Sequence, residues 1–154
     1  MTMQAGDVIT PIPPAAFYHD DTTIVNIVDT TYVTGSPEVG VYFLAPTSGT
    51  VRITVGAGVR DNGGSNRDRL FISPAVYRVT PTGLEEVLAP SVTFRGYGGS
   101  EAVTEMQYGC RVSLLTGLTP GTQYYARIMY FTSSGVDPDT ADINARDLIV
   151  IPMP

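Results

Sequence analysis

The sequence lacks lysine altogether and has one cysteine and one histidine among its 154 residues. Without lysine, neither Schiff-base chemistry nor a phosphate-binding P-loop lysine is available. A single cysteine excludes an intrachain disulfide, and with it a disulfide-stapled extracellular scaffold. Cys110 occupies an apolar-phase position of a strand pattern, which predicts a buried and inert thiol. His19 lies far from it in the sequence, so a Cys–His nucleophile pair is not expected.

Charge is scarce as well, because charged residues make up 16% of the chain against a typical ~25%. All nine basic residues are arginine, and none precedes Arg52, whereas five acidic residues do. The first third therefore carries −5, while nine arginines and ten acids leave −1 on the remainder. Such an acidic segment would repel a phosphate backbone, which argues against nucleic-acid binding. It is either a solvated lead-in or a segment that docks on a basic partner surface.

Long apolar runs are also missing. No run approaches the ~20 residues of a membrane-spanning helix, so we expect no membrane partner. The N-terminal stretch MTMQAGDVITP has neither the basic region nor the apolar region of a signal peptide.

Short β-type patterns fill the chain instead, together with 16 glycines and 12 prolines. Residues 50–60 alternate strictly, with Val51, Ile53, Val55, Ala57 and Val59 on one face. Turn signals recur about every 8–12 residues, and the eight to ten predicted strands indicate an all-β antiparallel β-sandwich, jelly-roll-like, with an extended N-terminal arm. Residues 1–35 form the acidic, proline-containing arm and residues 36–154 the sandwich domain. Pro74 interrupts a predicted strand and indicates an edge position or a bulge.

Three predicted strands are apolar on both faces, at residues 41–45, 124–131 and 148–151. A sandwich strand needs one apolar face, so the second face requires a cover. The cover is either the chain's own leading segment or identical subunits. We expect a homo-oligomer, with a trimer preferred by analogy to other jelly rolls. Phe17, Tyr18 and Tyr32 are the candidate arm contacts, because aromatic side chains dominate interface energies. A chain without residues 1–21 is expected to keep its sandwich and lose its partner.

Polar clusters do not form a persuasive chemical site. The consecutive residues His19, Asp20 and Asp21 point in alternate directions in an extended segment and cannot surround a metal ion unaided. Residues 61–68 resemble a calcium loop but miss the EF-hand spacing, and Asp137, Asp139 and Asp142 are a second candidate. Turn chemistry explains the composition of both segments without an ion. The acid pairs Glu85–Glu86 and Glu101–Glu105 are not arranged for glycoside hydrolysis. We therefore predict no catalytic, cofactor-binding or metal-binding residue and no enzyme.

Arginines and one glycine-rich loop provide the remaining polar candidates. Arg95 and Tyr97 are expected on an exposed loop, where they could contact a sugar or a protein. Five arginines are expected to point outward and to form cross-strand pairs with acids or threonine. They are Arg52, Arg60, Arg111, Arg127 and Arg146.

Three segments, taken in order, resemble a known family. FLAPTSGTVRITVGAGVR (residues 43–60), TGLTPGTQYYARIMY (116–130) and RDLIVIPMP (146–154) are similar to a β-sandwich of actinobacterial phage virion proteins. Members are of the capsid decoration, head-fibre or minor tail type. The GLTPGTxY piece also resembles fibronectin type III domains, where the tyrosine, here Tyr124, forms a structural tyrosine corner.

The resemblance implies a structural virion protein with no catalytic residues. We expect a capsid decoration protein that cements the particle surface as an oligomer, contacts the major capsid protein and is made in the host cytoplasm. The alternative is a minor tail or fibre module that contacts the host envelope, with glycan binding as one option.

Overall fold

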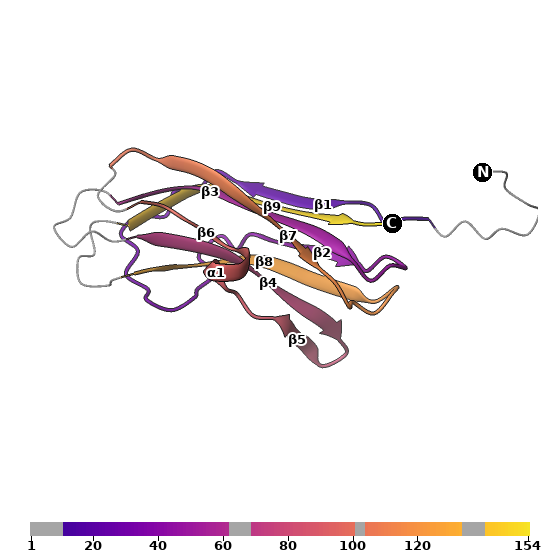
Figure 1. Cartoon of the computed structure of the whole chain (residues 1–154). Coiled ribbons are helices and arrows are strands. Elements are labelled where there is room, and N and C mark those ends of the chain that lie inside the picture. The colour runs from indigo at the N-terminus through magenta and orange to yellow at the C-terminus, as the bar shows by residue number, and fades with distance from the viewer. Residues whose placement is uncertain (1–10, 62–68, 101–103, 134–140) are drawn as a thin grey trace, which may run out of the picture.

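A computed structural model describes residues 11–61, 69–100, 104–133 and 141–154. Within these ranges, two antiparallel sheets stack into a sandwich (Figure 1). Sheet A has the order β1 (Ala16–Asp20), β9 (Ala141–Pro152), β3 (Val51–Asp61) and β7 (Gln107–Leu115). Sheet B has the order β2 (Gly40–Leu44), β8 (Gln123–Thr132), β4 (Leu70–Thr80) and β5 (Gly83–Leu88), with the short β6 (Tyr97–Gly98) also paired to β4.

The chain folds as one long hairpin that is wrapped over itself. Strand β4 pairs with β5, β3 with β7, β2 with β8, and β1 with β9. Successive pairs fall alternately in sheet B and sheet A, and the contacts of β3 with β9 and of β4 with β8 join them. This is the jelly-roll arrangement, so the predicted fold class is confirmed.

The core lies between the sheets, as the alternation in residues 50–60 predicts. The five apolar residues of that face are at most 4% exposed. They pack with buried side chains of sheet B such as Ile72, Val76 and Ile128. The helix α1 (Val92–Arg95) has four residues, and no helix in the described part of the chain is long and apolar enough to cross a membrane.

Pro74 lies where its missing N–H costs no ladder bond. On one side β4 pairs with β8, where Pro74 faces Ile128. On the other side, β6 pairs with Phe71 and Ile72, and β5 pairs only from Val76 onward. Pro74 therefore falls in the gap between these partners, next to a register shift at Val76.

A β-bulge in β9 changes which side chains face the core. Asn144 pairs with Gly58 and Asp147 with Gly56, so β9 has one residue more than β3 between these pairs. Ala145, within the bulge, has a φ of 45°. The extra residue reverses the alternation, so Arg146 faces the core and is 0% exposed. The expectation that Arg146 points outward is therefore wrong.

Part of the predicted arm belongs to the sandwich. Residues 16–20 are an edge strand of sheet A, Ile27 lies in the core, and Val33 bridges to Tyr130. Because Asp20 is the ionic partner of the buried Arg146, a chain without residues 1–21 loses more than an arm. The expectation that it keeps an intact sandwich is corrected accordingly, while the division at residue 35 stays a prediction.

Candidate functional site

Strand β7 turns its apolar side chains to the solvent. Tyr108, Val112 and Leu114 are 67%, 54% and 62% exposed. The alternate set lies on the core side of the strand, where Leu115 packs against the core. Arg111, which pairs with the core residue Val55, stays exposed and donates to the carbonyls of Val92 and Gly96. Such an inverted pattern on an edge strand is typical of a surface that another molecule covers.

Cys110 belongs to the same outward set and is exposed, so the predicted buried thiol is wrong. The physical reason is the inversion itself. The prediction assumes that the apolar set of a strand faces the core. In β7 that set faces outward, so the assumption places Cys110 on the wrong side.

The outward side chains of sheet A line up in rows across the strands. We call this surface the outer face. Its central row is Phe17, Ile149, Thr54 and Val112, from β1 to β7. The row on one side is Ile151, Arg52 and Leu114, and the row on the other is His19, Asp147, Gly56 and Cys110. Phe17 is 75% exposed, so the central row presents an apolar strip to solvent.

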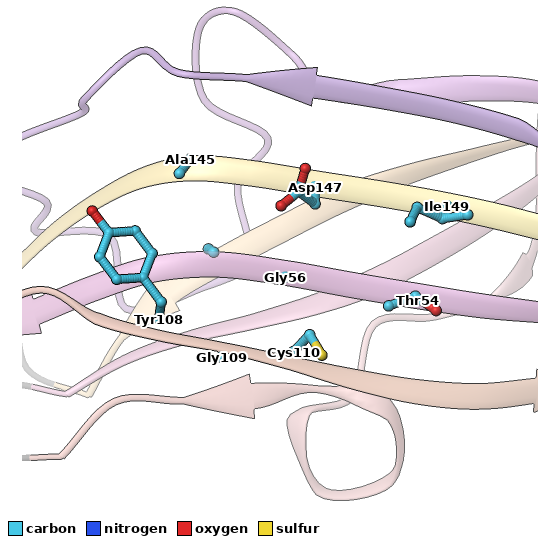
Figure 2. Close-up of a pocket in the computed structure, with 9 residues that line it drawn as sticks. Thr54, Gly56, Tyr108, Gly109, Cys110, Ala145, Asp147 and Ile149 are labelled. Carbon is cyan, nitrogen blue, oxygen red and sulfur yellow. The ribbon is translucent and has the colours of Figure 1, made fainter.

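A groove of about 510 Å³ opens in the outer face beside Gly56. Figure 2 shows Tyr108 at one end of it and Thr54 and Ile149 toward the other. Gly56 has no side chain to fill the row, and a Cβ there would lie 3.3 Å from the Cys110 Cβ. The groove therefore has a largely apolar lining with the Asp147 carboxylate on one wall.

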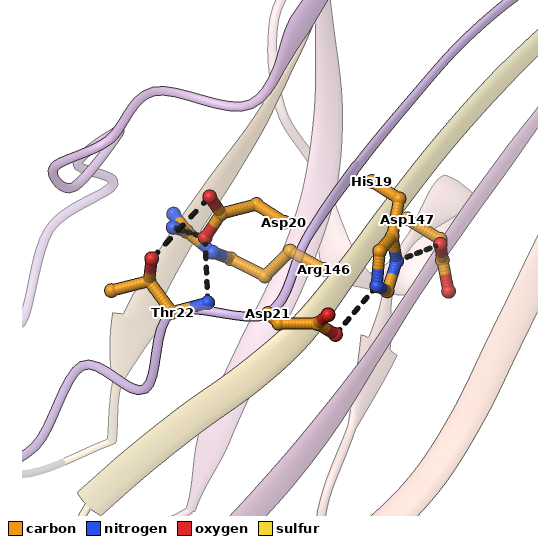
Figure 3. Close-up of polar contacts among 6 residues, drawn as sticks. All are labelled: His19, Asp20, Asp21, Thr22, Arg146 and Asp147. Carbon is orange, nitrogen blue, oxygen red and sulfur yellow. Dashed lines mark hydrogen bonds and ion pairs between the residues drawn. The ribbon is translucent and has the colours of Figure 1, made fainter.

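His19 is bonded to Asp147, one of the residues that line this groove. Its Nδ1 lies 2.6 Å from Asp147 Oδ1 and its Nε2 lies 2.6 Å from Asp21 Oδ1 (Figure 3). Only the doubly protonated imidazolium can donate to both carboxylates. The hydrogen bond to Asp147, followed by that to Asp21, raises the pKa of His19 above 6.5. In its protonated form the ring therefore fastens edge strand β1 to β9.

The adjacent residue, Asp20, points to the other side of β1 and meets Arg146. Arg146 Nη2 donates to Asp20 Oδ1 at 2.9 Å, and the Thr22 backbone N–H donates to the same oxygen at 3.0 Å (Figure 3). Burial alone would raise the pKa of Asp20, but these hydrogen bonds outweigh it and hold the pKa below its ordinary value. His19, Asp20 and Asp21 thus serve as structural ties. No group of three or more metal-ligating side chains occurs among the described residues.

The candidate arm contacts lie in two places. Phe17 and Tyr18 are neighbours on β1, 75% and 44% exposed, so both are available to a partner. Tyr32 instead packs edge-on against Phe131 at 4.7 Å and accepts the Val92 N–H at 2.8 Å. It covers part of the second apolar face of β8 from within the chain.

Arg95 and Tyr97 do not form an exposed loop pair. Arg95 ends α1 and donates to the Ala89 carbonyl at 2.9 Å. The Tyr97 ring packs against the core and would collide with a Cβ at Gly109. The expectation of an exposed aromatic at Tyr97 is therefore wrong.

Tyr124 makes the contact of a tyrosine corner. It is 1% exposed, and its Oη accepts the Thr119 backbone N–H at 3.0 Å. This bond fixes the turn before β8 and leaves no group free for a ligand.

The second face of sheet B is only partly covered. Tyr42 and Leu44 remain 57% and 46% exposed. Beside them, the Glu38 carboxylate accepts from the Tyr125 hydroxyl and, at 3.1 Å, from Arg127. Leading residues of the chain thus cover some of the predicted second faces and leave others open.

Two of the remaining acidic candidates have structural partners, and several others lie outside the described residues. Asp142 is fully buried and bonds Arg60 Nε at 2.6 Å. Glu85 forms a surface ion pair with Arg78. The calcium-loop candidates at 62–68, Asp137 and Asp139, and the candidate acid Glu101, fall outside the described residues.

Sequence reasoning missed Asp147, Gly56 and the outward role of β7. Asp147 faces outward only because of the bulge at Ala145, which has no glycine or proline to mark it. One signal was present: glycines alternate at positions 56 and 58 within a strand, which suggests close approach or a recess.

Comparisons with known proteins show distant likenesses of fold. No family model and no curated protein matches the chain. The structure of Eiger TNF from S. frugiperda aligns at 11% identity and a TM-score of 0.45, over 94% of each chain. Structures of the infectious bursal disease virus Gx strain and of its VP2 subviral particle align at 14% and 12% identity, both with a TM-score of 0.47. They cover 99% and 91% of this chain, which spans only 37% and 33% of theirs.

Proposed function

We propose that this chain is a non-enzymatic structural protein of a phage particle, a capsid decoration protein that works as a homo-oligomer on the particle surface. Two observations support the proposal. Three ordered sequence segments resemble actinobacterial phage virion proteins. The outer face of sheet A exposes an apolar strip and an inverted edge strand, which carries the argument for assembly.

The mechanism is cementing through buried apolar area. Side chains such as Phe17 and Leu114 lose water when another subunit covers them, at roughly 25 cal/mol per Å². Tyr18 and the rest of β1 add contacts to the major capsid protein. Analogy with other jelly rolls suggests a trimer, whereas the outer face of sheet A favours a two-fold pair, and a mass measurement in solution decides between them.

The runner-up is a minor tail or fibre module at the host envelope. Its suggested sugar contact, Arg95 with Tyr97, is weakened because the Tyr97 ring packs inward. The Tyr42 and Leu44 surface of sheet B is the exposed alternative for such a contact.

Cryo-electron microscopy of the particle that contains this chain tests the proposal. Density that fits the sandwich at repeated positions on the head lattice is the expected result. Density only at the tail end would support the runner-up, and a particle without such density would contradict both.

A further inference from the structure

We infer that the outer face of sheet A binds the same face of a second copy of this chain, about a two-fold axis that runs along the central row Phe17–Ile149–Thr54–Val112. The inference rests on the proposed function in taking a homo-oligomer as the working form, and it specifies the contact.

The geometry of the rows makes the outer face complementary to itself. On β3, Arg52 and Gly56 lie two residues on either side of Thr54, about 6.6 Å away in each direction. Rotation about the central row therefore places Arg52 of one copy opposite Gly56 of the other. On β7, the same rotation places Leu114 opposite Cys110, because Val112 lies midway between them.

The charges agree with this placement. Arg52 is exposed and makes no hydrogen bond or ion pair with any residue in the described ranges. The groove that it would enter is lined by Gly56 and by the Asp147 carboxylate. Oδ1 of Asp147 accepts from His19, so Oδ2 is the oxygen that would receive the guanidinium. A two-fold contact forms this Arg52–Asp147 pair twice.

The area is sufficient for a stable pair. Phe17, Tyr108, Val112 and Leu114 alone expose on the order of 500 Å², at the upper end of the patches that monomers carry. The half-buried Ile149 and Ile151, together with the exposed Arg52 and Cys110, bring the face toward the ~800 Å² per partner of a standard interface. Apolar side chains occupy its centre and the charged pair lies beside them, as in known interfaces.

Mass measurement by light scattering or ultracentrifugation tests the contact. We expect the full chain to have twice the 16.4 kDa mass of one copy. Val112→Glu would place two like charges together at the axis and should raise the dissociation constant at least about ten-fold. Val87→Glu is the matched control, because Val87 is an exposed valine on β5, the edge strand of sheet B, and should leave the mass unchanged.

A charge exchange tests the axis itself. Arg52→Asp opposes Asp147 with a second carboxylate, and Asp147→Arg opposes two arginines, so each variant alone should be monomeric. A mixture of the two should recover the two-copy mass, since both pairs are then of opposite charge. Circular dichroism verifies that each variant is folded. A mixture that stays monomeric would overturn the proposed axis.

Modification of Cys110 by a maleimide gives a second readout on the unaltered protein. Leu114 of the second copy should cover the thiol, so its reaction should be at least about ten-fold slower in concentrated than in dilute protein. A thiol that reacts equally fast at both concentrations contradicts the contact. A trimeric wild-type mass overturns the two-fold contact and keeps the homo-oligomer of the proposed function, whereas a monomeric mass overturns both. The particle location is tested separately, by microscopy of the particle.

Discussion

At the scale of single residues, Arg146 has a costly environment. Its side chain is fully buried, and its Nε and Nη1 have no hydrogen-bond partner. Only Nη2 meets a carboxylate, that of Asp20. A buried cation with one partner depends strongly on that partner, because removing it leaves an uncompensated charge in the core.

We therefore predict that Asp20→Ala lowers the free energy of unfolding by about 3 kcal/mol, measured by urea denaturation. Asp21→Ala is the control, since the Asp21 side chain is 85% exposed, and it should cost much less. Adding Arg146→Met to Asp20→Ala should recover part of the loss, because no buried charge then remains. Equal losses for the two aspartate variants would contradict this explanation.

His19 predicts a measurable pH dependence. Its pKa is raised above 6.5 by Asp147 first and Asp21 second, so the two hydrogen bonds stabilise the fold fully below about pH 6.5. That contribution is lost as the pH rises through the raised pKa. With one histidine in the chain, a single imidazole signal in an NMR titration reports the midpoint directly. Asp147→Asn should lower the midpoint more than Asp21→Asn, and a wild-type midpoint at or below 6.5 would refute the assignment.

At the scale of elements, the sequence predicts strands well where one face is buried and the ladder is regular. Strand β3 is an example, since its alternation from Val51 to Val59 identifies the core face correctly. Strand β7 has an equally clear alternation, but its apolar set faces outward and leaves Tyr108, Val112 and Leu114 exposed, which is the observation behind the proposed contact between copies. The alternation shows that a segment is a strand with two different faces, and only the pairing register shows which of the two faces the core.

The candidate site was largely beyond sequence reasoning for the same reason. The bulge at Ala145 reverses the phase of β9, which moves Arg146 inward and Asp147 outward. The groove then joins residues of β3, β7 and β9 that are separated by up to 95 positions, from Thr54 to Ile149. The sequence predicts that Phe17, in the leading segment, contacts a partner. It does not predict that Ile149, Thr54 and Val112 lie beside Phe17 in one row.

The turn before β8 provides a prediction at this scale. Tyr124→Phe removes the acceptor of the part-buried Thr119 N–H bond while the ring remains, so the fold should lose about 1 kcal/mol. Denaturant unfolding measures the change. Tyr18→Phe is the matched control because Tyr18 is 44% exposed, and its effect should be near zero. A similar loss in both variants would exclude a specific role for the corner.

At the scale of the whole molecule, the outer face predicts that stability depends on protein concentration. Association stabilises the folded chain by mass action, so the thermal midpoint of the wild type should rise by about 2 °C for each ten-fold increase in concentration. Val112→Glu should show a constant midpoint over the same range. Calorimetry at several concentrations measures both, and a constant wild-type midpoint would indicate a stable monomer.

The wrapped hairpin also has a consequence for synthesis on the ribosome. The innermost strands, β4 and β5, are separated by two residues and can pair as soon as they emerge. Ala16 must wait for Val150, which at about 5–20 residues per second takes roughly ten seconds. Sheet A is thus completed last. Until β9 has been synthesised, Asp20 lacks Arg146, the arginine that neutralises its charge. A pause in translation before residue 141 would therefore hold back the closing of the sandwich, even though its centre has already formed.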